Sequence, residues 1–344
     1  MERSISKANI SIRNTMIVLF LLAMLISIIG IGHMVFSSWF VSAGNITESI
    51  AATLNESIHN QIHSFLHEPE HINAMYYTML QNEIVDLTNE DKRNRFFVGV
   101  LNAHEDDIYS FSFGTANGEY YGARRNENGE IEIMKSNADT GGNSWYYSLN
   151  EDWTAGERVL QAGQFDPRTR AWYQIAVEAG GQAFSPVYKH FVMDDLSISA
   201  ALPVYNKDGL QGVLGTHMLL SGIGSYLADT VYDYNGYSII IEKSTGALIA
   251  NSMGMDNFEI LEGGEAKRKD IFELEDPDVI QAYEQFTKDQ EPQFLYQGKK
   301  ANHHINVKEL NMGGLDWVIM SAIPTEQFFS DVMAAIRLTM LLAV

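Results

Sequence analysis

The chain has 344 residues, no cysteine and a formal net charge of −21 at pH 7. The absence of cysteine excludes disulfide bonds and thiolate metal sites, and a chain of this length buries enough apolar surface to fold without them. The excess of acidic residues argues against nucleic acids and anionic membrane surfaces as partners.

The first predicted element is a transmembrane helix over residues 15–36. This stretch is apolar, its one titratable side chain is His33, and it is long enough to span a hydrocarbon core of about 30 Å. Arg3, Lys7 and Arg13 precede it. Because basic residues stay on the cytoplasmic side, we expect residues 1–14 in the cytoplasm and residues 37–330 outside the cell membrane.

Both ends of the chain have an alternative interpretation. Val41-Ser-Ala43 resembles a signal-peptidase site, although the apolar run exceeds the roughly 7 to 15 residues of a signal-peptide core. Residues 331–344 are mostly apolar and are predicted to begin a second transmembrane helix, in which Arg337 reaches back to the interface. An amphipathic or core helix is the alternative. If both spans exist, the natural protein continues into a cytoplasmic output region, such as a kinase, a diguanylate cyclase or a chemotaxis adaptor.

A long extracytoplasmic helix is predicted over residues 37–76. An apolar stripe recurs at every third or fourth residue, at Ile46, Ile50, Leu54, Ile58, Ile62 and Phe65. A four-residue spacing also relates four histidines, His59, His63, His67 and His71. We interpret this row as a solvated polar face rather than a metal site, and we expect Pro69 to interrupt the helix before His71.

An internal repeat sets the architecture of the remaining chain. The segment Tyr109–Gly118 has a counterpart in Tyr237–Gly246, since each begins with Tyr-Ser and reaches a glycine turn nine residues after the tyrosine. Similarly, the strand Gly209–His217 matches Gly314–Ala322. Each of these strands is expected to lead into a short apolar helix, at residues 223–227 and 328–332.

The repeat predicts two modules in tandem, residues 77–232 and 233–330, with a turn-rich boundary at residues 230–236. Each module begins with a hairpin and ends with another strand pair, which favours an antiparallel sheet with helices packed on it. The expected fold class is therefore α+β, with a long N-terminal helix, two antiparallel-sheet modules and flanking transmembrane helices.

The two modules differ in one stretch. The first contains Phe165-Asp-Pro-Arg-Thr-Arg-Ala-Trp-Tyr173 before a helix that ends near Gly180, then a hairpin that pairs Phe184–His190 with Leu196–Leu202. The second module has no such stretch. We expect the turn of this hairpin at Asp194-Asp195.

This combination resembles the ligand-binding module of double Cache sensor domains. These are extracytoplasmic, PAS-like tandem domains of bacterial chemoreceptors, sensor kinases and cyclic-dinucleotide enzymes, and the resemblance covers residues 37–330. It implies that the membrane-distal module, residues 77–232, binds a small molecule and that the membrane-proximal module, residues 233–330, relays the signal. It also implies a homodimer formed along the first helix.

The candidate ligand-binding residues come from this stretch and from the closing strand. Arg170 offers a planar fork of donors for a carboxylate, and Trp172 and Tyr173 offer flat apolar walls with polar handles. Strand alternation places Tyr188 and His190 on one face together with Phe184. The complete set is Phe165, Arg170, Trp172, Tyr173, Tyr188, His190 and His217. Asp166 and Arg168 are interpreted as structural, pairing within the loop or capping the helix. The alternative for Trp172 and Tyr173 is that they are plain core residues. The alternative for Arg170 is a buried internal salt bridge.

Two departures from the family bear on the ligand. Members that bind amino acids or amines have an aspartate at the position of His217 and a tyrosine at that of Phe165. An imidazole is a poor partner for an ammonium group, so a standard α-amino acid is not expected. The pocket is expected to prefer an acceptor-rich or anionic ligand, because it brings together Arg170, His217, His190 and Lys189. A small carboxylate such as a hydroxy or keto acid is the first prediction, and a nucleobase-like ring that stacks on Trp172 and Tyr173 is the second. A core position bonded to a backbone carbonyl is the alternative for His217.

No catalytic activity, cofactor or metal site is predicted within this chain. It contains no phosphate-binding Gly-Lys-Ser/Thr loop, no Gly-x-Ser-x-Gly elbow and no cysteine nucleophile. The functional prediction is the sensor region of a bacterial transmembrane signalling receptor. The alternative is an envelope module that docks a solute-binding protein or a cell-wall component and leaves its pocket empty.

Overall fold

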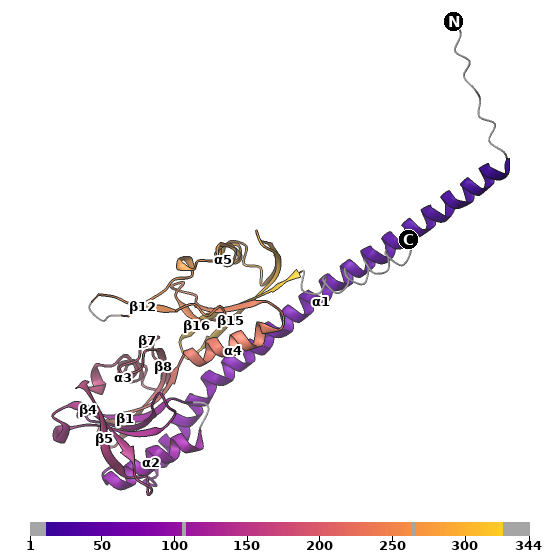
Figure 1. Cartoon of the computed structure of the whole chain (residues 1–344). Coiled ribbons are helices and arrows are strands. Elements are labelled where there is room, and N and C mark those ends of the chain that lie inside the picture. The colour runs from indigo at the N-terminus through magenta and orange to yellow at the C-terminus, as the bar shows by residue number, and fades with distance from the viewer. Residues whose placement is uncertain (1–11, 105–107, 263–265, 326–344) are drawn as a thin grey trace. The chain divides into compact units, whose positions relative to one another are not determined.

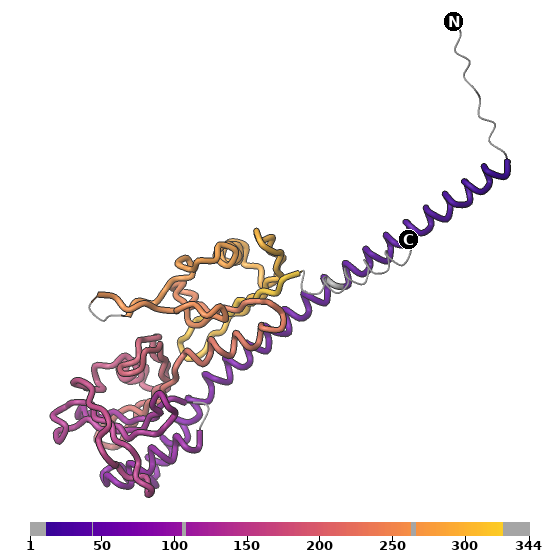
Figure 2. Tube along the Cα trace, viewed as in Figure 1, coloured from indigo at the N-terminus to yellow at the C-terminus, as the bar shows by residue number. Residues whose placement is uncertain are grey.

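The computed structural model of the chain describes residues 12–104, 108–262 and 266–325 (Figure 1). The chain divides into two units. One includes the chain up to Ile50, and the other, Ala51–Pro324, contains both large sheets. Figure 2 shows the Cα trace, coloured along the chain. In chain order, all strands of the first sheet precede those of the second.

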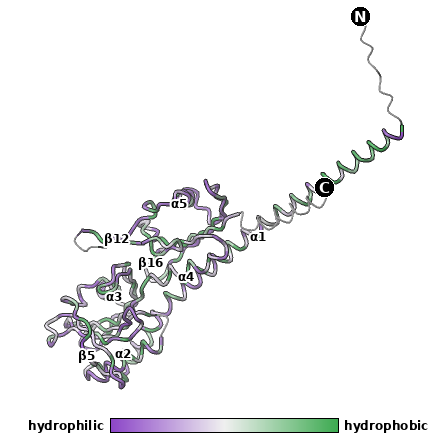
Figure 3. Tube along the Cα trace, viewed as in Figure 1, coloured by the Kyte–Doolittle hydropathy of each residue, from purple (hydrophilic) through white to green (hydrophobic). Residues whose placement is uncertain are grey.

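Helix α1, Ile12–Gln81, contains 70 residues. Its N-terminal part is apolar and exposed, and it is the green stretch of the helix in Figure 3. Among the described residues, α1 is the one helix that is long and apolar enough to cross a membrane by length and composition. The predicted span 15–36 lies within α1. The predicted second span, 331–344, and the predicted short helix 328–332 lie outside the described residues.

The buried stripe of α1 differs from the predicted one at its N-terminal end. Ile58 and Ile62 are buried as expected, but Ile46 is exposed and Leu54 is only half-buried, while the polar Asn55 is buried. A strict four-residue spacing rotates by about 40° per step around a helix with 3.6 residues per turn. Residues that keep that spacing therefore leave the core-facing side.

The prediction that Pro69 interrupts this helix is wrong, because α1 continues to Gln81. A proline inside a helix removes one hydrogen bond and costs about 3 kcal/mol. Here Pro69 is itself buried, and Ile72 and Tyr76 beyond it are part of a core cluster. Burying such side chains contributes about 1.5 to 3 kcal/mol each, which offsets the cost.

The first sheet has nine strands in the order β5-β4-β3-β2-β1-β9-β8-β6, and β7 also pairs with β8. Its pairings are antiparallel. The strands are β1 (Ser110–Thr115), β2 (Tyr120–Arg125), β3 (Ile131–Ser136), β4 (Asn143–Leu149), β5 (Ala155–Gln164), β6 (Ala183–Phe184), β7 (Tyr188–Lys189), β8 (Leu196–Asn206) and β9 (Gly209–Leu219). Helices α2 (Glu90–Ala103) and α3 (Ala171–Ala179) contact this sheet, whereas α4 (Ser221–Tyr232), which follows it in the chain, contacts β10 and β11 of the second sheet.

The second sheet has five strands in the order β11-β10-β16-β15-β14, and a separate ribbon pairs β12 with β13. The strands are β10 (Tyr237–Glu242), β11 (Leu248–Asn251), β12 (Phe258–Ile260), β13 (Ala266–Arg268), β14 (Gln293–Gln297), β15 (Asn302–Met312) and β16 (Leu315–Pro324). Helix α5, Pro277–Asp289, packs its apolar face into this module's core. The predicted α+β class, with a long first helix and two antiparallel modules, is confirmed.

The two faces of the first sheet have different partners. On one side, Ile198 of β8 and Met218 of β9 belong to a core cluster that also contains Ile62 of α1 and Trp317 of the second sheet. On the other side, Trp172 of α3 belongs to a separate cluster with Tyr120 and Tyr146. Strand alternation explains this division, because successive side chains point to opposite faces. The second face carries the candidate site.

A buried asparagine joins α1 to the strands that form this site. The Asn73 Nδ2 donates to the Ala200 carbonyl at 2.9 Å, and the Thr216 hydroxyl donates to the Asn73 Oδ1 at 2.8 Å. Asn73 and Thr216 are both fully buried. Since Ala200 and Thr216 adjoin Ser199 and His217, α1 is bonded directly behind the candidate site.

Candidate functional site

A cavity of about 280 Å³ lies on the α3 side of the first sheet. Aromatic side chains and a few cationic or neutral donors form its wall. The lining residues are Ser110, Tyr120, Met134, Tyr146, Phe165, Thr169, Arg170, Ala171, Trp172, Tyr188, Lys189, His190, Phe191 and His217. This lining contains no aspartate and no glutamate. Six of the seven predicted residues line the cavity, and Tyr173 does not.

The loop before α3 is ordered by its own side chains. Asp166 caps the short 3-10 helix Pro167–Thr169 by accepting from the Arg168 backbone N–H at 3.0 Å. Its carboxylate also pairs with the Arg168 guanidinium at 2.7 Å on the exposed side. This pairing lowers the pKa of Asp166. The structural interpretation of Asp166 and Arg168 therefore agrees with the geometry, and Arg170 follows as the N-cap residue of α3.

Arg170 has no carboxylate partner among the described residues. Its guanidinium carbon lies 4.4 Å from the Phe165 ring centre and 4.8 Å from that of Phe191. Its Nε is buried and makes no hydrogen bond to a described residue. Burial lowers the pKa of Arg170, and nearby tyrosines and Asp166 oppose the shift only in part. The cavity therefore contains a partly desolvated cation beside a pair of aromatic rings that contact each other, without the internal salt bridge of the alternative interpretation.

Trp172 and Tyr173 are separated by the turn of the helix. Trp172 lines the cavity and meets His217 edge-on, with ring centres 5.3 Å apart. Tyr173 is buried in the same core cluster but outside the cavity lining, and its hydroxyl makes no hydrogen bond to a described residue. Successive residues of a helix point about 100° apart, so one of the two faces away when the other lines the cavity. The assignment of Tyr173 to the lining is therefore corrected.

His217 is held by hydroxyl groups on both sides of its ring. The Ser112 Oγ lies 2.8 Å from its Nε2, and the Ser199 Oγ lies 2.7 Å from its Nδ1. The residue is 4% exposed, and burial lowers its pKa to about 3. His217 is therefore neutral at physiological pH and adds no positive charge, contrary to its expected contribution to anion binding. The environment of His217 is close to that of the alternative interpretation, a core histidine, but its partners are serine hydroxyls and not a backbone carbonyl.

The predicted strand Phe184–His190 is broken into β6 and β7. Pro186 lies in the break and has no N–H to donate to a sheet. Phe184 is consequently part of the core shared with the second module, whereas Tyr188 and His190 line the cavity. The prediction that all three side chains share one face is wrong for Phe184. The Tyr188 hydroxyl lies 2.7 Å from the Ser199 Oγ, which extends the hydroxyl chain beside His217.

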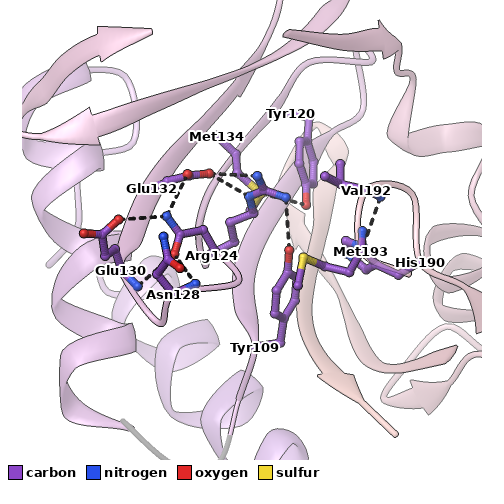
Figure 4. A network of polar contacts seen from close by, with 11 residues as sticks. Tyr109, Tyr120, Arg124, Asn128, Glu130, Glu132, Met134, His190, Val192 and Met193 are labelled. Carbon is purple, nitrogen blue, oxygen red and sulfur yellow. Dashed lines mark hydrogen bonds and ion pairs between the residues drawn. The ribbon is translucent and has the colours of Figure 1, made fainter. Parts of the chain in front are cut away.

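A buried ion pair beneath the cavity escaped the sequence analysis (Figure 4). Arg124 binds Glu132 through two contacts of 3.0 and 2.8 Å, and it donates to the Tyr109 hydroxyl at 3.2 Å. The guanidinium also lies 3.9 Å from the Tyr146 ring centre, which lines the cavity. The sequence contained a pattern that predicts this pair. Arg124 and Glu132 flank the turn Asn-Glu-Asn-Gly, and a hairpin at this turn places them at directly paired positions of β2 and β3.

We expect His217 to make the fold less stable in acid. An unfolded histidine titrates near pH 6.5, so between pH 6.5 and about 3 the unfolded state binds a proton that the folded state excludes. Above pH 6.5 His217 is neutral in both states and does not change the unfolding free energy. Below pH 6.5 it lowers the unfolding free energy by about 1.4 kcal/mol per pH unit. Unfolding free energies measured from pH 4.5 to 7 should fall less steeply for His217→Asn than for the wild type. Parallel curves would contradict the buried neutral state.

The comparisons with known proteins agree on a sensor domain. Residues 115–225 match the family model described as methyl-accepting chemotaxis protein-like, first PDC sensor domain. A stretch of 123 residues is 24% identical to the methyl-accepting chemotaxis protein McpC of Bacillus subtilis, covering 36% of this chain and 19% of McpC. The chain therefore matches less than a fifth of that relative.

Solved structures share the fold. The ligand-binding domain of the Campylobacter jejuni chemoreceptor Tlp3 in complex with L-valine has a TM-score of 0.52 and 13% identity, covering 85% of this chain and 98% of that chain. The same domain with 4-methylisoleucine has a TM-score of 0.50 and 12% identity, covering 85% and 94%. Together these matches confirm the predicted resemblance to extracytoplasmic Cache-type sensor domains.

Proposed function

We propose that the chain is the sensor region of a bacterial transmembrane receptor that detects a small carboxylate in its first module. The observation that carries this proposal is Arg170, a partly buried cation without a carboxylate partner in a cavity whose described lining contains no acid. Desolvating a cation is unfavourable unless an anion compensates it. A ligand carboxylate, bound bidentately by the guanidinium fork, supplies that compensation.

The lining supports carboxylates over amines. A ligand ammonium group is best matched by a carboxylate, and the lining offers instead aromatic rings, hydroxyl groups, Arg170, Lys189 and two histidines whose pKa values are lowered to about 3. The Tlp3 structures contain valine and 4-methylisoleucine. In this chain the family's aspartate is replaced by His217, which supports a different ligand class. Short hydroxy and keto acids are our first candidates, and nucleobase-like rings that stack on Trp172 are the second.

Signalling in this proposal uses two helices. Ligand binding favours one of two arrangements of α1 and a second membrane helix beginning near residue 331, and α1 is bonded behind the cavity through Asn73. A ligand shifts such an equilibrium only by its difference in affinity for the two arrangements. We propose a homodimer along α1, where Ile46, Ile50 and Leu54 remain at least partly exposed. A cavity lined by both Arg170 and His217 favours sensing over the docking alternative.

A ligand screen tests the proposal. The 344-residue chain is solubilised in detergent, and its thermal unfolding is followed with organic acids, nucleobases, amines and amino acids. A ligand at 100 times its Kd should add about 2.7 kcal/mol to the folded state. We expect stabilisation by carboxylates. Stabilisation only by amines or amino acids would contradict the ligand class, and no stabilisation across the library would favour the docking module.

A further inference from the structure

The ring of His190 is fixed in one tautomer. Its Nδ1 accepts the backbone N–H groups of Val192 at 3.1 Å and Met193 at 2.9 Å (Figure 4). A ring nitrogen that accepts these bonds carries no hydrogen, so the neutral imidazole carries its hydrogen on Nε2. Burial lowers the pKa of His190 to about 3, with smaller contributions from His217, Arg124 and Lys189. The residue is therefore a neutral N–H donor.

The Nε2 donor makes no hydrogen bond to a described residue, and His190 lines the cavity. The ring is held in place from below. It meets Tyr109 edge-on, with ring centres 4.8 Å apart and an interplanar angle of 78°. Tyr109 in turn accepts from Arg124, which is fixed by Glu132 (Figure 4). A donor positioned by a buried ion pair, with no acceptor in the described part of the chain, is suited to a ligand.

The charges of the lining indicate which ligand group this donor meets. Lys189 is already paired with Asp194 at 3.2 Å and with the Met193 carbonyl at 2.5 Å. His217 is neutral between its two serines. Arg170 is thus the one lining cation without a described anionic partner, which is enough for a single carboxylate. A second ligand group beside His190 meets a neutral donor and is best matched by a neutral oxygen.

We propose that the His190 Nε2–H donates to a neutral oxygen of the ligand, so that the sensor selects carboxylates that also carry a hydroxyl or keto group. This inference rests on the proposed function, in which Arg170 binds the carboxylate. His190 then decides which carboxylates bind well. A site with a fixed donor discriminates against an analogue that lacks the acceptor, because the donor is left unpaired once the bound ligand covers it.

Two substitutions separate the donor from the loop contact. In His190→Asn, the amide oxygen takes the place of Nδ1 and accepts the Val192 and Met193 N–H groups, as Asn does in turns, but nothing replaces the Nε2 donor. In His190→Gln, the amide nitrogen reaches toward the place of Nε2, and the acceptor at Nδ1 is lost. The first variant removes selectivity alone, whereas the second removes the loop contact alone.

The test measures calorimetric Kd values of the full chain in nanodiscs for L-lactate, pyruvate and propionate, which share three carbons and a carboxylate. The wild type should bind lactate and pyruvate about tenfold more tightly than propionate. His190→Asn should bind all three with the propionate affinity of the wild type, to within about twofold. His190→Gln should keep the preference while all three bind more weakly, because the loop that carries Phe191 is less well anchored.

The outcomes distinguish this inference from the proposed function. If carboxylates bind but the wild type shows no preference among the three, or if the preference survives in His190→Asn, the role of His190 is refuted and the carboxylate sensor stands. If none of the three acids binds the wild type while an amine or amino acid does, the proposed function itself is refuted, and the inference with it.

Discussion

Replacing Arg170 with methionine should strongly weaken carboxylate binding while the protein still folds. Methionine retains the aliphatic bulk beside Phe165 and Phe191 but removes the guanidinium fork. Loss of a buried charge-assisted pair costs about 2 to 5 kcal/mol in binding, so affinity should fall by roughly 30-fold to several thousandfold. Because Arg170 has no carboxylate partner among the described residues, the ligand-free variant should unfold at the wild-type temperature or above it.

Arg168→Met is the matched control for this experiment. Arg168 is two residues away, exposed and paired with Asp166. Exposed ion pairs contribute about 1 kcal/mol or less, so this variant should keep its ligand affinity and lose little stability. Equal affinity in Arg170→Met and the wild type would remove Arg170 from the site. A large loss of stability without ligand would instead assign Arg170 a structural partner.

The sequence predicted those features of the site that depend on short stretches of chain. Arg170 and Trp172 are brought together because a capped 3-10 helix leads directly into α3. His217 was placed by the repeat that defines the closing strand β9. Tyr173 was misassigned although it adjoins Trp172, since the sequence does not specify which face of α3 meets the cavity.

Features that depend on burial or on the break between β6 and β7 were not predictable. The neutral state of His217 results from its burial between Ser112 and Ser199, which come from different strands. Lys189 was expected only to lie near the cavity, and its pairing with Asp194 was not foreseen. The stripe of α1 illustrates the same limit, since Asn55 is buried by contacts with a distant strand, including a bond from Ser321 at 3.1 Å.

Replacing Glu132 with leucine should strongly destabilise the fold. The Arg124 and Glu132 side chains are 4% and 10% exposed, and their closest atoms are 2.8 Å apart. Removing one partner leaves an uncompensated buried charge, which typically costs about 3 to 5 kcal/mol. We expect the unfolding free energy, measured by urea titration of the solubilised chain, to fall by about this amount. Ligand affinity should weaken as well, because Arg124 also contacts Tyr109 and Tyr146.

A second substitution shows whether the charge or the shape matters. In the double variant Arg124→Met with Glu132→Leu, both charges are absent, and most of the lost stability should return because apolar replacements of a buried pair are often close to neutral.

Glu309→Leu is the matched control, since Glu309 pairs with Lys243 at 2.7 Å but both side chains are about 40% exposed. It should cost about 1 kcal/mol or less. If Glu132→Leu lowers the unfolding free energy no more than Glu309→Leu does, the buried pair does not stabilise the fold around the cavity. If the double variant is stable but no longer distinguishes lactate from propionate, the pair acts by positioning Tyr109 and His190.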